Sequence, residues 1–137
     1  MKEKLNILLI EDDMIEVMKL NRAISSLHLT HHIVEANNGE EALQILQNKN
    51  ELPDIILLDL NMPKLNGIEF LSILKNDDDL RYIPTVILTT SNNQKDLKEC
   101  FKIGVSGYVL KPLKYEEYVT KVSKILDYWS INELITN

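Results

Sequence analysis

Acidic side chains stand where two apolar runs of this chain end. Residues 11–13, with the sequence Glu-Asp-Asp, follow the apolar run 7–10, and Asp59 ends the run 54–59, directly before a loop marked by Pro63. Carboxylates held close together raise each other's pKa unless a cation lies between them. Because hard oxygen ligands suit Mg²⁺, this pattern indicates a magnesium site.

A threonine and a lysine end two later apolar runs. Thr89 closes the run 85–89, and Lys111 follows the run 107–110. A carboxylate beside a divalent cation, a hydroxyl and an ammonium can accept a phosphoryl group, because phosphoryl transfer is catalysed mainly by positioning and charge neutralisation. Asp59 would be the nucleophile and would form an acyl phosphate. Lys111 and the cation would neutralise two phosphoryl oxygens, and the Thr89 hydroxyl would donate a hydrogen bond to the third.

These side chains need a sheet that brings the ends of its strands together. Short apolar runs predict strands, and longer segments with apolar residues at helical spacing predict helices. The strands are expected at 5–10, 32–36, 54–59, 85–89 and 107–110, and the helices within 14–27, 42–46, 68–74, 92–103 and 114–129. Such alternation predicts an α/β fold with a doubly wound parallel sheet covered on both faces. Sites in these sheets form at the carboxyl ends of the strands, so the polar residues should converge there.

Four motifs occur together and in order: residues 11–13, the segment 57–63 with Asn66 and Gly67, Thr89, and the segment 107–112. With these motifs, residues 4–129 resemble the receiver domain of a single-domain response regulator of the chemotaxis-regulator type. The resemblance implies a flavodoxin-like, three-layer (βα)5 sandwich with strand order 2-1-3-4-5, the order found in chemotaxis regulators and flavodoxin. The sequence pattern alone does not yield that order.

The resemblance also implies a ligand set for the metal. Asp12 and Asp59 would bind Mg²⁺ directly, and Glu11 would bind it through water. Asn61 would contribute its backbone carbonyl. Mn²⁺ could substitute for Mg²⁺, and no organic cofactor is implied.

Further roles implied by the resemblance concern the strands next to Asp59. A cis peptide bond between Lys111 and Pro112 would aim the ammonium at Asp59. Thr89 and Tyr108 would form a switch, in which Thr89 moves toward the phosphoryl group and Tyr108 turns inward. Alternatively, Tyr108 is a half-buried strand residue whose hydroxyl reaches water.

The function implied by the resemblance is that of a response regulator in a two-component phosphorelay. A sensor histidine kinase or a phosphotransfer protein would phosphorylate Asp59, in a reaction that the receiver domain itself catalyses. Slow autodephosphorylation would follow, without the turnover of an enzyme, and the phosphorylated form would switch protein–protein interactions. Pro84, the pair Thr89–Thr90 and the pair Tyr128–Trp129 are similar to the stand-alone regulators of bacterial phytochrome-type kinases.

The length of 137 residues fits one domain, which we expect to span 1–137, with its core at about 4–129 and a C-terminal extension at 130–137. Because no effector domain is expected beyond it, output would come through contact with an unknown downstream protein. Aromatic residues concentrated near the C-terminus predict a homodimer through the last strand and helix.

Composition argues against several other functions. The formal net charge is −6 and no basic stripe is present, which argues against nucleic-acid binding. The longest apolar runs are much shorter than the ~20 residues of a membrane span, so no membrane association is expected. A single cysteine, Cys100, predicts a reducing, cytoplasmic setting.

Simpler interpretations exist for several of these residues. The acids at 11–13 could merely favour a helix start, with Asp12 or Asp13 as the cap. Lys111 could be a solvated lysine at a strand end. The histidines flank a short strand without partners at ligand spacing, which predicts surface or structural roles for them rather than metal binding: His28, His31 and His32.

Two other classes of protein compete with a response regulator. Hydrolases of the haloacid-dehalogenase type also use Mg²⁺ and an aspartate after a parallel strand, but they usually carry a second aspartate where this chain has Asn61. A receiver-like binding module that is never phosphorylated commonly lacks one of the acids, the threonine or the lysine. All of them are present here.

Overall fold

A computed structural model describes residues 4–62 and 65–135, so Pro63 of the predicted loop lies outside the described residues. Strands and helices alternate along the chain. They are β1 (Asn6–Ile10), α1 (Met14–Ser26), β2 (His32–Ala36), α2 (Gly39–Leu46), β3 (Ile55–Leu58), α3 (Gly67–Lys75), β4 (Thr85–Thr89), α4 (Gln94–Ile103), β5 (Gly107–Leu110) and α5 (Tyr115–Ser130).

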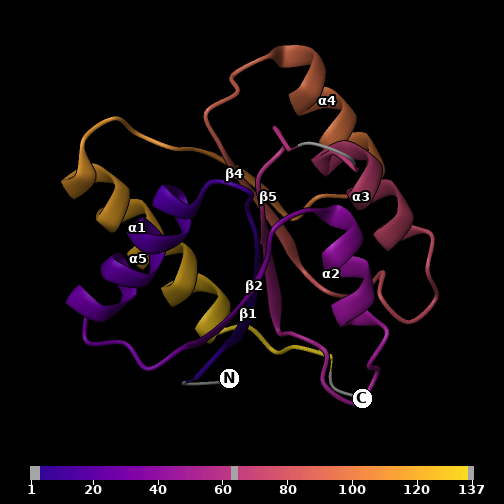
Figure 1. Cartoon of the computed structure of the whole chain (residues 1–137), viewed down its shortest axis with the longest axis horizontal. Coiled ribbons are helices and arrows are strands. Elements are labelled where there is room, and N and C mark those ends of the chain that lie inside the picture. Colours follow the sequence, from indigo (N-terminus) through magenta and orange to yellow (C-terminus); the bar gives the residue numbers. More distant parts are fainter. Residues whose placement is uncertain (1–3, 63–64, 136–137) are drawn as a thin grey trace.

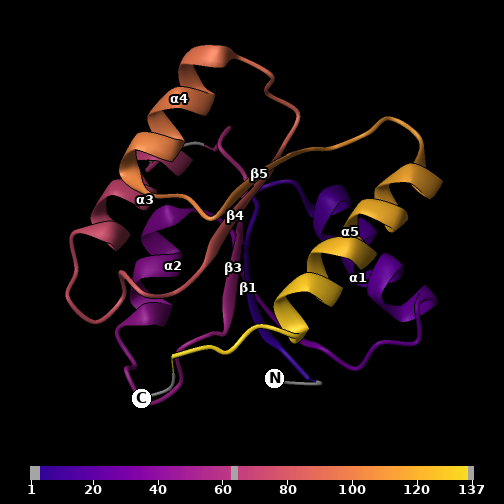
Figure 2. The ribbon, with the colours of Figure 1, turned by 180° about the vertical axis from the view of Figure 1, so that it is seen from behind.

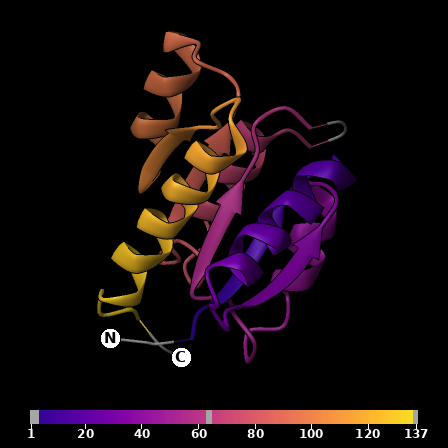
Figure 3. The same cartoon turned by 90° about the vertical axis from the view of Figure 1, so that its left-hand side faces the viewer.

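The strands form one parallel sheet in the order β2-β1-β3-β4-β5. Helices α1 and α5 cover one face, and α2, α3 and α4 cover the other, which gives three layers (Figure 1, Figure 2). Figure 3 looks onto the layer of α1 and α5, with the sheet behind it. The doubly wound α/β class and the strand order are both confirmed.

Alternate side chains of the central strands enter different cores. In β1, Leu8 and Ile10 pack in the core on the side of α2 and α3, whereas Ile7 and Leu9 pack on the side of α1 and α5. Successive residues of a strand point to opposite faces, so a strand covered on both sides must be apolar throughout. This is why unbroken apolar runs predicted the strands.

Polar residues set the ends of several helices. The Asp13 side chain accepts a hydrogen bond from the Ile15 N–H at 2.9 Å and caps α1, one of the two caps predicted there. Asn66 and Glu69 form a reciprocal capping box at the start of α3. Gly104 ends α4 with a φ of 123°, a conformation that favours glycine.

The C-terminal helix begins and ends one residue later than the sequence predicted. It continues to Ser130, and Leu134 beyond it packs against the core of α1 and α5. Residues 136 and 137 of the expected extension lie outside the described residues. Within the described part of the chain, none of the helices has the length and apolar composition needed to cross a membrane.

Candidate functional site

Three of the predicted carboxylates meet at the carboxyl edge of the sheet. Glu11, Asp12 and Asp59 each offer an oxygen that lies within 4.8 Å of the others. Glu11 and Asp59 are buried, whereas Asp12 is exposed. Among the described residues, this is the one group of acids, histidines or cysteines close enough to hold a metal ion, so the histidines do not form one.

The pairing of β1 with β3 brings these acids together. Ile10 and Leu58 are partners in the parallel register, so the residues that follow them leave the sheet side by side. The Asp59 N–H donates to the Ile10 carbonyl at 3.1 Å, which continues the ladder one residue beyond the strand. The sheet therefore holds the Asp59 backbone in place.

Gly67 lets the start of α3 approach the Asp59 backbone closely. Its N–H donates to the Leu60 carbonyl at 3.2 Å. A Cβ at this position would lie only 2.6 Å from the Asp59 carbonyl oxygen and 2.7 Å from the Leu60 Cα. Both are backbone atoms that cannot move aside, so a side chain at position 67 would displace the segment that carries Asp59.

The chemistry of the three carboxylates fits a hard divalent cation. Glu11 and Asp59 are buried close together, and a cation between them would reduce the repulsion between their charges. Oxygen ligands of this type suit Mg²⁺ and Mn²⁺. The contribution of the Asn61 backbone carbonyl stays a prediction.

Lys111 reaches into this site from the end of β5. Its Nζ donates to Glu11 Oε1 at 2.6 Å and lies 3.4 Å from Glu16 Oε2. Among the described residues, no ion pair within 4.0 Å joins Lys111 to Asp59. The ammonium therefore lies beside the acids of β1 and α1 and is not paired with Asp59.

Burial and charge have opposite effects on the pKa values of Glu11 and Lys111. Burial raises the pKa of Glu11 to about 7, although the hydrogen bond and charge of Lys111 lower it. For Lys111, burial alone would lower the pKa. The hydrogen bond to Glu11 and the charges of Glu11, Asp59 and Glu16 outweigh burial, so the pKa of Lys111 is raised above its ordinary value. Lys111 is therefore held as an ammonium.

The peptide bonds of the described residues are all trans, so the predicted cis bond between Lys111 and Pro112 is wrong. The trans form is the preferred one even before proline, by about 0.5–1 kcal/mol. With the trans bond, the Lys111 side chain already reaches Glu11, and its backbone N–H donates to the Thr89 carbonyl at 2.8 Å.

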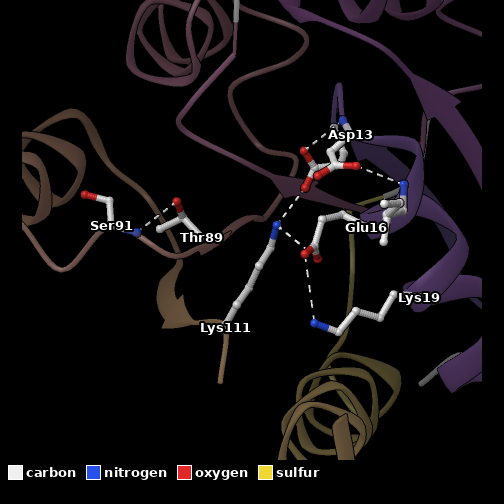
Figure 4. A network of polar contacts seen from close by, with 8 residues as sticks. Asp13, Glu16, Lys19, Thr89, Ser91 and Lys111 are labelled. Carbon is white, nitrogen blue, oxygen red and sulfur yellow. Dashed lines mark hydrogen bonds and ion pairs between the residues drawn. The ribbon is translucent and has the colours of Figure 1, made fainter. Parts of the chain in front are cut away.

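Thr89 and Tyr108 are linked through one residue of the loop after β4. Thr89 is fully buried, and its Oγ1 accepts a hydrogen bond from the Ser91 N–H at 3.3 Å. The half-buried Tyr108 donates its hydroxyl to the Ser91 carbonyl at 2.8 Å, whereas the simpler interpretation sent that hydroxyl to water. Figure 4 shows Thr89 and Ser91 on one side of Lys111, and Glu16 on the other.

Glu16 is a residue of the site that the sequence interpretation missed. It lies in the first turn of α1, not at the end of a strand, so the rule that selected the other residues passed over it. The available signal was an acidic residue in the helical turn directly after the acidic strand end. Such residues are usually explained by the helix dipole.

Several known proteins are similar in sequence to this chain. The sequence pattern of the Response regulator receiver domain matches residues 7–123. The probable methanogenesis regulatory protein FilR2 of Methanothrix harundinacea is 39% identical over 127 residues, which cover 90% of this chain and 82% of FilR2. The response regulator Rcp1 of Synechocystis is 32% identical over 128 residues, which cover 90% of this chain and 87% of Rcp1.

Solved structures with a similar fold include two regulators of this kind. The phosphorylated cyanobacterial phytochrome response regulator RcpA superposes with a TM-score of 0.90 and 31% identity, over 97% of this chain and 99% of RcpA. The Mn²⁺-bound form of Rcp1 superposes with a TM-score of 0.87 and 30% identity, over 96% of this chain and 99% of Rcp1.

Proposed function

Because the chain belongs to the response regulator receiver domain family, we propose that Asp59 accepts a phosphoryl group from a sensor histidine kinase or a phosphotransfer protein. The observation that carries this proposal is the cluster of Glu11, Asp12 and Asp59 at the carboxyl edge of the sheet, with the Lys111 ammonium beside it. The family is a signalling family, so the result of the reaction is a modified protein and not a released product.

In the proposed reaction, an Asp59 carboxylate oxygen attacks the phosphorus of a phosphohistidine. The P–N bond breaks, an O–P bond forms, and the imidazole leaves with the bonding pair. Asp12 and Asp59 directly, Glu11 through water and the Asn61 carbonyl would hold Mg²⁺ or Mn²⁺, which would supply positive charge to the phosphoryl oxygens.

The remaining residues of the site act on the phosphoryl group through charge and hydrogen bonds. The Lys111 ammonium neutralises one phosphoryl oxygen, and the Thr89 hydroxyl donates to another. The same groups let small phosphodonors label the protein without a kinase, and water slowly hydrolyses the acyl phosphate.

A switch through Thr89 and Ser91 is the proposed output of phosphorylation. Movement of the Thr89 hydroxyl toward the phosphoryl group breaks its hydrogen bond with the Ser91 N–H. The loop after β4 then shifts, Tyr108 loses the Ser91 carbonyl as its acceptor, and the face of α4, β5 and α5 changes its protein partners. Phosphorylation acts by stabilising one of two packings.

The similarity to Rcp1 and RcpA supports a more specific donor. RcpA is described as a phytochrome response regulator, and we extend that pairing to a phytochrome-type histidine kinase for this chain. The phosphorelay step would take place in the cytoplasm, where ATP-dependent kinases act. The downstream partner would be a protein that binds the phosphorylated form.

The test is labelling by a small phosphodonor. Wild-type protein incubated with acetyl phosphate and Mg²⁺ should gain the mass of one phosphoryl group, and hydroxylamine should remove it. Asp59→Asn should keep its fold and gain no label, because the side-chain amide of asparagine is not nucleophilic at neutral pH. Asp78→Asn, which makes the same change at a surface acid, should be labelled like the wild type.

Labelling of Asp59→Asn at the wild-type stoichiometry would overturn the assignment. A second assay addresses the hydrolase alternative, because a phosphatase would turn over an aryl phosphate many times. We expect no turnover beyond the single phosphoryl group that each receiver can hold.

A further inference from the structure

The Lys111 ammonium lies between two carboxylates that belong to different elements. Glu11 at the end of β1 is 2.6 Å away, and Glu16 in the first turn of α1 is 3.4 Å away. Figure 4 shows the Lys111 side chain extending from β5 toward Glu16. Glu11 and Glu16 thus both attract the Lys111 ammonium, which the proposed reaction also requires.

Glu16 has little other compensation for its charge. Its Oε2 is buried and accepts no hydrogen bond within the described part of the chain, so the Lys111 ammonium is what faces it. Its Oε1 lies 3.9 Å from Lys19, whose ammonium also lies 4.4 Å from the centre of the Tyr118 ring. A buried carboxylate oxygen without a hydrogen bond is costly unless a cation is near, so Glu16 and Lys111 stabilise each other.

There is little room for water beside this contact. A cavity of about 10 Å³ lies among Glu11, Glu16, Asp59, Lys111 and Tyr118. That volume holds about one water molecule at most. The charges therefore interact directly, with little screening by solvent.

We propose that Glu16 is a positioning residue that holds Lys111 away from Asp59 in the unphosphorylated protein. This inference rests on the proposed function, because it concerns the lysine of the same site. A phosphoryl group on Asp59 draws the ammonium toward its oxygens, and the ion pair with Glu16 must then break. Glu16 thereby opposes phosphorylation and sets how readily the site is occupied.

The experiment measures binding of beryllofluoride, a phosphoryl mimic, with Mg²⁺ present. Glu16→Gln keeps the shape of the side chain but removes the charge, so it should bind the mimic at least about threefold more tightly, the factor that an ion pair at the protein surface would give. Glu40→Gln is the matched control, because Glu40 is an exposed acid in the first turn of α2. It should bind like the wild type.

The ¹⁵Nζ resonance of Lys111 distinguishes positioning from a general structural effect. Without beryllofluoride, the resonance should differ between wild type and Glu16→Gln, because the ion pair is lost in the variant. With beryllofluoride bound, the two resonances should coincide, because Lys111 then contacts the phosphoryl mimic in both proteins and no longer contacts residue 16.

Other outcomes would overturn the inference in distinguishable ways. Equal or weaker binding by Glu16→Gln, or a resonance difference that persists in the bound state, would show that Glu16 does not hold the lysine back. If the wild type binds no beryllofluoride at all, the proposed function of Asp59 fails and this inference fails with it.

Discussion

Ser91 joins the parts of the site that have to move together. Its N–H donates to Thr89, its carbonyl accepts from Tyr108, and its hydroxyl donates to Asp96 in the first turn of α4 at 3.1 Å. A shift of Thr89 therefore reaches both the aromatic residue on β5 and the start of α4 through one residue. The contacts are polar and partly solvated, so each is worth about 1 kcal/mol or less and can be exchanged for water.

Tyr108→Phe tests this link at the level of one atom. The variant keeps the ring packed against the core but loses the 2.8 Å hydrogen bond to the Ser91 carbonyl. We expect a loss of about 0.5–1 kcal/mol in the free energy of unfolding, because the bond is only partly buried. We also expect faster amide exchange in the loop 90–93 of the unphosphorylated protein, measured by mass spectrometry.

Tyr82→Phe is the control for Tyr108→Phe, because it removes the hydroxyl of an exposed tyrosine outside the site. Exchange in the loop 90–93 should stay at the wild-type rate in that variant. If Tyr108→Phe also leaves this rate unchanged, the hydroxyl does not restrain the loop, and the proposed route from Thr89 to Tyr108 loses its middle step.

The elements were predictable from sequence to the extent that burial dictates residue type. The central strands β1, β3 and β4 are covered on both faces and so appear as unbroken apolar runs. Strand order was not predictable in this way, since apolar strands are compatible with many orders, and it came from the resemblance. The site residues at strand ends were predicted from their position in the sequence. The role of Glu16 could not be predicted in this way, because it depends on how α1 packs. The geometry of the Lys111–Pro112 bond has no signal in the sequence.

His31 connects the start of β1 to the start of β2, and its protonation should weaken that connection. The Leu5 N–H donates to His31 Nδ1 at 2.9 Å, which requires this nitrogen to be unprotonated. Burial lowers the pKa of His31, against an opposing effect of the Asp127 charge. In the unfolded chain the pKa is about 6.5, so the unfolded state takes up the proton first as the pH falls.

Wild-type protein should therefore lose stability relative to His31→Asn as the pH falls below about 6.5. Asn can present an oxygen where the histidine presents Nδ1, and it does not titrate. The difference should not exceed the ~1 kcal/mol of one hydrogen bond, and it should be absent above pH of about 7.5. Urea unfolding of both proteins at several pH values measures it, and a difference independent of pH would contradict this role of His31.

At the scale of the whole molecule, the sheet is covered on both faces but has two open edges, β2 and β5. Edge strands present unpaired backbone groups that can pair with another chain. Each edge also exposes one large apolar side chain, Val34 on β2 with 39% exposed and Leu110 on β5 with 38% exposed. On the β5 side, Leu97 and Gln94 of α4 line a groove together with Tyr108 and Leu110. A groove lined by Val34 lies beside β2 as well. The aromatic residues concentrated in β5 and α5 are therefore what favours β5 for self-association.

We expect a homodimer through β5 and α5, and the two edges provide a matched pair of variants. Leu110→Glu would bury a carboxylate in that interface and should weaken the dimer at least about tenfold, because an unpaired buried charge costs more than about 1.4 kcal/mol. Val34→Glu makes a similar change at an equally exposed position on the other edge and should leave the dimer intact.

Light scattering over a range of concentrations, with and without beryllofluoride, measures the molecular mass. A wild-type protein that stays monomeric under all these conditions would exclude the dimer, and loss of the dimer in Val34→Glu alone would assign it to β2.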